Sequence, residues 1–268
     1  MVANFHTHTT FCDGKNTPEE IVLAALDKGF SAIGFSGHAF TAFDQRYCMQ
    51  DTEGYIAEVR RVQEKYAREI EVYLGIEEDA FAPVRRDRFD YLIGSSHYFC
   101  VSGRYYPIDS DYEYFKGCLD AFDGDILRLA ETYFSVFLDY IKRRRPDIVG
   151  HFDVITKFDE VDVARFSCND AYLALAERYA AEVAKSGCIV EVNTGPMWRG
   201  YRQTPLPNEN VLRILHKQGA EVMIASDSHS VDTLDYRLGD IKAYLRDVGF
   251  RHVMTMRGGR FVRESLYE

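Results

Sequence analysis

The sequence lacks the features that mark secreted, membrane-bound and zinc-ribbon proteins. Its six cysteines include no C-x-x-C pair, the spacing that is typical of structural zinc sites and of redox motifs. We therefore expect reduced thiols and a cytoplasmic protein. We expect no signal peptide, because no basic segment and no apolar segment precede the first strand-like residues. No run is long and apolar enough to span a membrane, so no membrane partner is expected.

An excess of positive charge is also missing. The chain has 32 Lys and Arg residues against 42 Asp and Glu residues, which gives a formal net charge of -10. This balance argues against a broad surface for nucleic acid or for anionic membranes, although a few local cations could still hold an anionic substrate. The basic run at 142–145 follows a helical pattern, and cations suit the C-terminal end of a helix dipole, so we interpret it as a solvated helix end. Neither repeats nor a linker divide the chain, and nothing in it indicates an oligomeric state.

What the sequence does contain is ample apolar material in a regular alternation. Hydrophobic residues make up 46% of the chain and aromatic residues 14%. Strand-like runs alternate with helical patterns, which predicts parallel strands with right-handed crossovers and an α/β barrel. The predicted strands are 3–9, 32–36, 72–76, 91–96, 148–150, 188–192, 221–226 and 252–256. The predicted helices are 17–29, 55–68, 124–145, 169–186, 208–218 and 235–248, and the tyrosine-rich stretch 98–115 is expected to be a long loop.

The first strand carries a possible metal site. His6 and His8 are two residues apart, so their imidazoles lie on the same face of an extended strand. Asp13 follows in a turn marked by Gly14 and can bend back towards them. Imidazole and carboxylate together suit a borderline divalent cation such as zinc, iron or manganese. An H-x-H pair alone is weak evidence, because histidines near strand ends are more often structural.

Similar groups follow several other predicted strands, and this repetition strengthens the hypothesis. In an α/β barrel the carboxyl ends of the strands share one face, where active sites are built. Two histidines, His216 and His252, fall elsewhere and are interpreted as structural. Nine donors are more than one zinc needs, and they fit two or three metals that share a bridging carboxylate. The candidate ligands are His6, His8, Asp13, His38, Glu77, His97, His151, Asp227 and His229.

The order H-x-H, D, H, E, H, H, D-x-H resembles the polymerase and histidinol phosphatase (PHP) superfamily across almost the whole chain. The resemblance implies a single PHP metallophosphatase domain over residues 1–268, folded as a distorted (β/α)7 TIM-like barrel. It also implies three divalent metals per chain, with Glu77 as a bridging ligand. The implied sets are His6, His8, Glu77 and Asp227 for one metal, Glu77, His97 and His151 for the second, and Asp13, His38 and His229 for the third.

Within this superfamily the sequence is most similar to the stand-alone histidinol-phosphate phosphatases. The run 191–199, Glu-Val-Asn-Thr-Gly-Pro-Met-Trp-Arg, resembles that group's Asn-Thr-Ser-Gly segment with its arginine, although Gly195 stands in place of serine. The run 151–158 resembles the group's H-x-D segment followed by a cation, with Lys157 where arginine is common. Arg199 and Lys157 are therefore the predicted contacts to a small phosphorylated substrate. An arginine can bind phosphate oxygens bidentately, while a lysine adds a point charge.

The implied reaction is hydrolysis of L-histidinol phosphate, a step of histidine biosynthesis, by a metal-bridging hydroxide. Glu77, Asp227 and His229 are the candidate catalytic residues, and either Asp227 or His229 could protonate the leaving alkoxide. Two alternatives stay open. One is a PHP phosphodiesterase or nuclease that acts on nucleotides, against which the acidic balance weighs. The other is a non-catalytic PHP module, which loss of ligands would mark.

Overall fold

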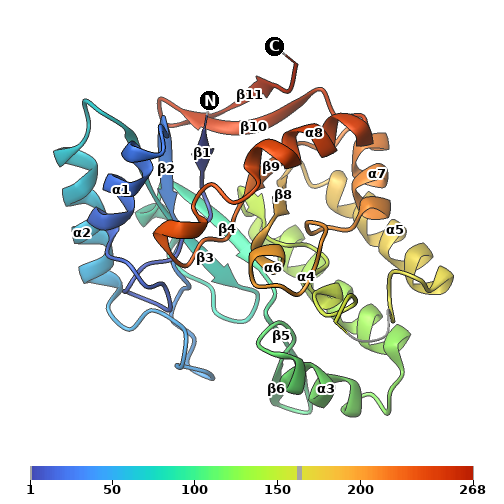
Figure 1. Cartoon of the computed structure of the whole chain (residues 1–268). Helices are drawn as coiled ribbons and strands as arrows, with labels where there is room; N and C mark the ends of the chain where they lie inside the picture. Colours follow the sequence, from blue (N-terminus) through green and yellow to red (C-terminus); the bar gives the residue numbers. More distant parts are fainter. Residues whose placement is uncertain (1, 162–164, 268) are drawn as a thin grey trace.

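The computed structural model describes residues 2–161 and 165–267, and its centre is one parallel sheet. Seven strands lie in the order β1-β2-β3-β4-β7-β8-β9. Beyond β1 and β9, a parallel bridge joins Thr7 to Ser228, so the sheet closes into a barrel. The predicted barrel is confirmed (Figure 1). The strands are β1 (Ala3–Asn4), β2 (Ala32–Phe35), β3 (Glu71–Asp79), β4 (Tyr91–Ser95), β7 (Ile148–Val149), β8 (Ile189–Asn193) and β9 (Val222–Ala225).

Helices connect these strands along the outside of the barrel (Figure 1). The Thr17 hydroxyl accepts a hydrogen bond from the Glu20 amide at 3.3 Å, and the Glu20 carboxylate accepts one from the Thr17 amide at 2.8 Å, which is the predicted capping box. Among the described residues, no helix is both long enough and apolar enough to cross a bilayer. The helices are α1 (Pro18–Asp27), α2 (Thr52–Lys65), α4 (Ile126–Arg144), α5 (Asp170–Ala184), α6 (Gly195–Trp198), α7 (Glu209–Lys217) and α8 (Leu238–Val248).

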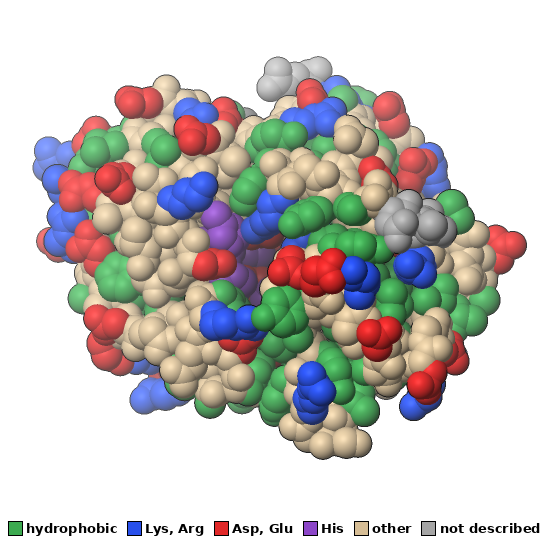
Figure 2. All heavy atoms as spheres, turned by 60° about the horizontal axis from the view of Figure 1, so that its bottom comes forward, with side chains coloured by type: hydrophobic (Ala, Val, Ile, Leu, Met, Phe, Trp, Pro, Cys, Tyr) green, Lys and Arg blue, Asp and Glu red, His purple; other side chains and the backbone are tan. Residues whose placement is uncertain are grey.

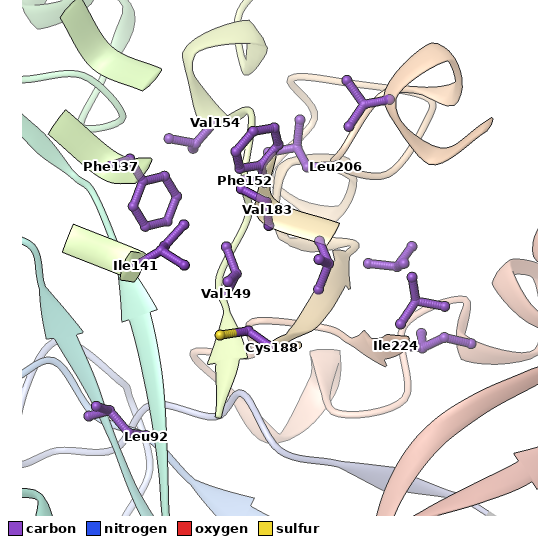
Figure 3. Close-up of a cluster of buried hydrophobic side chains, with 14 of the residues drawn as sticks. Leu92, Phe137, Ile141, Val149, Phe152, Val154, Val183, Cys188, Leu206 and Ile224 are labelled. Atoms are coloured by element: carbon purple, nitrogen blue, oxygen red, sulfur yellow. The ribbon is translucent and has the colours of Figure 1, made fainter. Parts of the chain in front are cut away.

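Apolar side chains fill both sides of the sheet. Outside the barrel, Phe137 and Ile141 of α4 pack towards the strands with Leu92 and Val149 (Figure 3). Inside, the strands contribute a second cluster that includes Tyr91, whose hydroxyl donates to the Phe5 carbonyl at 2.6 Å. The hairpin of β10 (His252–Arg257) and β11 (Arg260–Ser265) packs against this inner cluster through Met256. The amino-terminal end of the barrel is therefore closed and apolar.

Strand alternation separates two adjacent acids in β3. Residues 73, 75 and 77 point into the barrel, so Glu78 points outwards. Its buried carboxylate accepts hydrogen bonds from the Tyr140 hydroxyl at 2.9 Å, from Arg144 Nε at 2.7 Å and from the Val84 amide at 2.6 Å. Glu78 therefore joins α4 to the sheet, while Glu77 faces the carboxyl end of the barrel interior.

The prediction of a long loop over 98–115 is wrong. The stretch forms a hairpin of β5 (Tyr98–Val101) and β6 (Arg104–Pro107), followed by α3 (Tyr112–Asp120). Ser102 and Gly103 both have positive φ angles, which is the geometry of a tight type I′ turn. Gly258 and Gly259 also have positive φ angles and form the turn that joins β10 (His252–Arg257) to β11 (Arg260–Ser265). The strand β11 was not predicted from the sequence. In both cases aromatic or charged flanking residues hid the alternation of a short hairpin.

We predict that Arg144→Ala lowers the free energy of unfolding by about 2–4 kcal/mol, because it leaves the Glu78 carboxylate buried without its cation. Arg143→Ala is the matched control, since Arg143 lies one position earlier and pairs with Asp139 where both side chains are more than 60% exposed. The control should change stability by no more than about 0.5 kcal/mol. Urea unfolding of both variants in one metal-saturated buffer measures the difference, and equal losses would contradict the structural role of Glu78.

Candidate metal centre

A cavity of about 290 Å³ opens at the carboxyl end of the barrel. Histidine side chains are visible in this hollow, and Lys or Arg side chains lie near it (Figure 2). Its wall includes Asp13, His38 and His97 from the predicted ligand set, together with Arg199 and Lys157. Its size is that of a site for a small molecule.

Glu77 is the central anion of this site. Its side chain is fully buried, and its Oε1 atom accepts a hydrogen bond from the Ser95 hydroxyl at 2.6 Å. Burial alone would raise the pKa of Glu77, yet the histidines around it hold that pKa well below its ordinary value. Five imidazole nitrogens surround the carboxylate: His38 Nδ1 at 2.8 Å, His151 Nε2 at 3.0 Å, His97 Nε2 at 3.1 Å, His6 Nε2 at 3.3 Å and His8 Nε2 at 3.7 Å.

The structure brings the other eight predicted ligands together around Glu77. Asp227 Oδ1 lies 3.2 Å from His8 Nε2 and 3.7 Å from His6 Nε2. On the outer side, Asp13 Oδ2 lies 3.2 Å from His229 Nε2 and 3.8 Å from His38 Nε2. The donor atoms form compact groups whose members lie within 4.8 Å of one another: His6, His8 and Glu77; His38, Glu77 and His97; His8, Asp13, His38 and His229; and His97, Asp109 and His151.

The chemistry of these donors fits divalent cations. Among the described residues, His6 Nε2, His8 Nε2 and Glu77 Oε2 are buried atoms without a hydrogen-bond partner. Such atoms are costly to bury unless a cation or another partner satisfies them. Burial, together with His229 and His38, lowers the pKa of His8 to about 3, which favours its neutral form, whereas neighbouring carboxylates raise the pKa of His6, His38 and His97 despite their burial. A neutral imidazole is the form that binds a metal.

Comparison with known proteins agrees with this geometry. The family model of the PHP domain matches residues 4–195. The chain belongs to the PHP domain family. It is 29% identical to the probable histidinol-phosphatase of Deinococcus radiodurans, over 92% of this chain and 94% of that protein. It is 24% identical to the histidinol-phosphatase of Bacillus subtilis, over 86% of this chain and 94% of that protein.

A solved structure shares the fold of this PHP domain. It is the histidinol phosphate phosphatase of Lactococcus lactis, determined in complex with zinc, L-histidinol and phosphate. The two structures superimpose with a TM-score of 0.71, and the match covers 97% of this chain and 98% of the other at 16% identity. At that identity the likeness establishes the fold.

The turn after the first strand explains how Asp13 reaches the other candidate ligands. The Gly14 amide donates to the Thr9 carbonyl at 3.0 Å, so the chain folds back on itself. A Cβ atom at Gly14 would lie 2.5 Å from the His8 carbonyl carbon and from the Thr9 nitrogen. Only glycine permits this close approach, which confirms the turn expected at this position.

Two carboxylates that the sequence reading did not assign orient the histidines from behind. Glu191 Oε1 lies 2.5 Å from His6 Nδ1, and its Oε2 accepts a hydrogen bond from the His151 amide at 2.7 Å. Asp79 Oδ2 accepts a hydrogen bond from the His97 amide at 2.9 Å and lies 3.3 Å from His97 Nδ1. Such contacts fix which ring nitrogen is left to face a metal ion. Strand alternation was the available signal, because Asp79 follows Glu77 by two residues on the same face.

Arg199 lies at the wall of the cavity. Its Nη1 atom is 3.1 Å from Asp227 Oδ2, and its Nη2 atom is 3.0 Å from His229 Nδ1. A Cβ atom at Gly195 would lie 2.5 Å from Arg199 Nη1 and 2.6 Å from Asp227 Oδ2. The glycine that replaces the serine of the resembled motif therefore makes room for the guanidinium beside Asp227.

Lys157 also reaches the cavity, but much of its ammonium is already engaged. Its Nζ atom donates to the backbone carbonyls of Asp109 and, at 3.5 Å, of Ser110. Burial lowers the pKa of Lys157 to about 8. Since an ammonium has three donors, one remains for a substrate oxygen. The two histidines interpreted as structural lie outside the cavity lining: His252 contacts Glu221, and His216 packs on Phe250.

We predict that Glu191→Gln weakens metal binding by about 10- to 100-fold, the usual cost of losing a partner that orients a ligand. Glu221→Gln is the matched control, because Glu221 contacts His252 at 2.9 Å in a similar pair outside the cavity. Competition with a chromogenic zinc chelator measures both affinities. Equal zinc affinities in parent, Glu191→Gln and Glu221→Gln proteins would show that Glu191 does not orient His6 for metal binding.

Proposed function

We propose that the protein is a metal-dependent phosphomonoesterase that hydrolyses L-histidinol phosphate to L-histidinol and phosphate. The observation that carries this proposal is the convergence of eight other predicted ligands around the buried Glu77 carboxylate, at one small cavity. The curated relatives named above support the choice of substrate, since each is named as a histidinol-phosphatase and is matched over most of its length. The expected place of this reaction is histidine biosynthesis in the cytoplasm.

Three divalent ions, of zinc, iron or manganese, are the proposed cofactors. His6, His8, Glu77 and Asp227 would hold the first ion. Glu77 would also bind a second ion, together with His97 and His151. Asp13, His38 and His229 would hold the third. Bound ions of this kind supply a nucleophilic water at neutral pH and offset the charge that develops on the phosphoryl oxygens. The donor groups lie close enough together to serve neighbouring ions.

Side chains of the cavity wall complete the proposed site. Arg199 holds the phosphate, because its planar guanidinium can bind two phosphate oxygens at once. The Lys157 ammonium adds a positive charge near the same oxygens, and its third N–H can donate to one of them. Asp227 or His229 takes up the proton that the attacking water loses and passes it to the leaving oxygen of histidinol; both residues contact Arg199 at the cavity wall.

Neither alternative function gains support from the site. A nuclease would need a surface that follows a polyanion, whereas this chain has a net charge of -10 and a cavity of small-molecule size. A non-catalytic module would be expected to have lost donors, and all nine converge here.

Substrate choice is tested by assaying the purified protein, loaded with manganese or zinc, against matched phosphate esters. The panel contains histidinol phosphate, an aryl phosphate, a bis-aryl phosphodiester and a single-stranded oligonucleotide. The proposal expects the highest kcat/KM for histidinol phosphate and little turnover of the diesters. A metal-loaded protein that cleaves only the diesters, or none of the four, would overturn it.

For Arg199→Ala we expect kcat/KM to fall roughly 30- to 700-fold, because a desolvated charge-assisted contact to phosphate is lost. This fall corresponds to a loss of about 2–4 kcal/mol in transition-state stabilisation. Histidinol phosphate and the aryl phosphate should be affected alike, since both present the same phosphoryl group. Arg213→Ala is the control, because Arg213 is exposed on α7 and pairs with Glu209. Metal content should match the parent in both variants. Unchanged kcat/KM in Arg199→Ala would place the phosphate contact elsewhere, and Lys157 would be examined next.

A further inference from the structure

The segment from β5 to α3 lies beyond the carboxyl end of the barrel (Figure 1). Its connection between β6 and α3 passes along the wall of the cavity, where Pro107, Asp109 and Ser110 contribute to the lining. The Ile108 amide donates to the His97 carbonyl at 2.8 Å, and the Ile108 side chain is fully buried. Together with the Lys157 hydrogen bonds to the carbonyls of Asp109 and Ser110, these contacts fix the backbone on both sides of Asp109.

The carboxylate of Asp109 is held at the cavity without a partner of its own. Its oxygens take part in no hydrogen bond or ion pair with the residues that the structure describes, although Lys157 binds its backbone carbonyl. One oxygen lies with a ring nitrogen of His97 and one of His151 in a group whose donor atoms are all within 4.8 Å of one another. This half-buried carboxylate lies near the Lys157 ammonium and two imidazoles, and a divalent cation between the carboxylate and the imidazoles would stabilise both.

The number of donors around each proposed ion also favours Asp109 as a ligand. His6, His8, Glu77 and Asp227 give the first ion four donors, and His8 lies close enough to Asp13, His38 and His229 to make a four-membered group there. The ion between His97 and His151 would have only Glu77 as a third donor. A catalytic zinc ion can hold four or five ligands including a water, so this ion has room for one more protein donor, and among the described residues Asp109 is the further carboxylate grouped with this histidine pair.

We propose that Asp109 is a fourth protein ligand for the ion held by Glu77, His97 and His151, and that Lys157 positions it through the backbone carbonyl. This inference rests on the metal cluster of the proposed function. It makes the β5–α3 segment a metal-dependent wall of the cavity, because one of its residues binds the ion while the other ligands come from the barrel. Metal binding should therefore protect the backbone of residues 98–111 from exchange with solvent.

The test compares the full-length parent protein with Asp109→Asn, which removes the charge but keeps the shape of the side chain. Asp120→Asn is the matched control, since Asp120 is exposed on α3 of the same segment. Each protein is equilibrated with buffered free zinc, its zinc content is measured by elemental analysis, and hydrogen exchange of residues 98–111 is followed with and without zinc. Thermal unfolding of the zinc-free proteins, which should coincide, checks that the substitution leaves the fold intact.

The parent and Asp120→Asn should bind three zinc ions and show zinc-dependent protection of residues 98–111. Asp109→Asn should bind its weakest zinc at least about 10- to 100-fold less tightly and lose that protection, since removal of even an outer partner has this effect. Equal zinc binding and equal protection in all three proteins would overturn the inference. The inference would also be overturned if zinc binding is equal in all three proteins and Asp109→Asn raises KM for histidinol phosphate but not for the aryl phosphate. Asp109 would then bind the ammonium group of the substrate.

Failure of the proposed function gives a different result. A parent protein that binds three zinc ions, loses one in Asp109→Asn and hydrolyses no phosphate ester would support the ligand role of Asp109 while contradicting the phosphatase. A parent protein that binds no zinc and no manganese would overturn both.

Discussion

The buried carboxylate of Glu77 is the constraint on which the rest of the site depends. An ionised carboxylate that is removed from water is destabilising by several kcal/mol unless cations or hydrogen bonds compensate it. Apart from the Ser95 hydroxyl, its near neighbours are imidazole nitrogens at 2.8–3.7 Å. In the neutral forms of His6 and His97, whose Nδ1 atoms contact Glu191 and Asp79, the Nε2 lone pairs would face the carboxylate, which is unfavourable. Divalent cations between these donors would satisfy both the anion and the histidines, which is a physical reason for so many metal-type side chains to meet at one point.

The two ends of the barrel differ in chemistry: one is packed with apolar side chains and the other carries the donor groups. At the amino-terminal end, apolar side chains and the β10–β11 hairpin pack into a closed interior around Tyr91. At the carboxyl end, strand alternation places Glu77 and Asp79 on the same inward face, so Glu77 lies among the candidate ligands while Asp79 contacts His97. The apolar end holds the strands in register, and the register fixes the positions of the donors.

Much of this organisation could be predicted from the sequence, because it depends on local rules. His6 and His8 share a face through strand spacing, and His38, His97, His151 and Asp227 follow strands whose carboxyl ends meet in a barrel. The β5–β6 hairpin could not be recognised, since its Ser102-Gly103 turn lies within a tyrosine-rich stretch that reads as a loop. Asp109 was missed for the same reason. Its place beside His97 depends on tertiary contacts from Lys157 and Ile108, which leave no local pattern.

The central claim is that the nine donors form one cluster for three divalent ions around Glu77. Anomalous diffraction from crystals of the zinc-loaded protein, with data collected on both sides of the zinc absorption edge, tests it most directly. The account predicts three anomalous peaks in the cavity, two of them flanking the Glu77 carboxylate and the third between Asp13, His38 and His229. A single peak, or peaks only at surface residues outside the cavity, would contradict it.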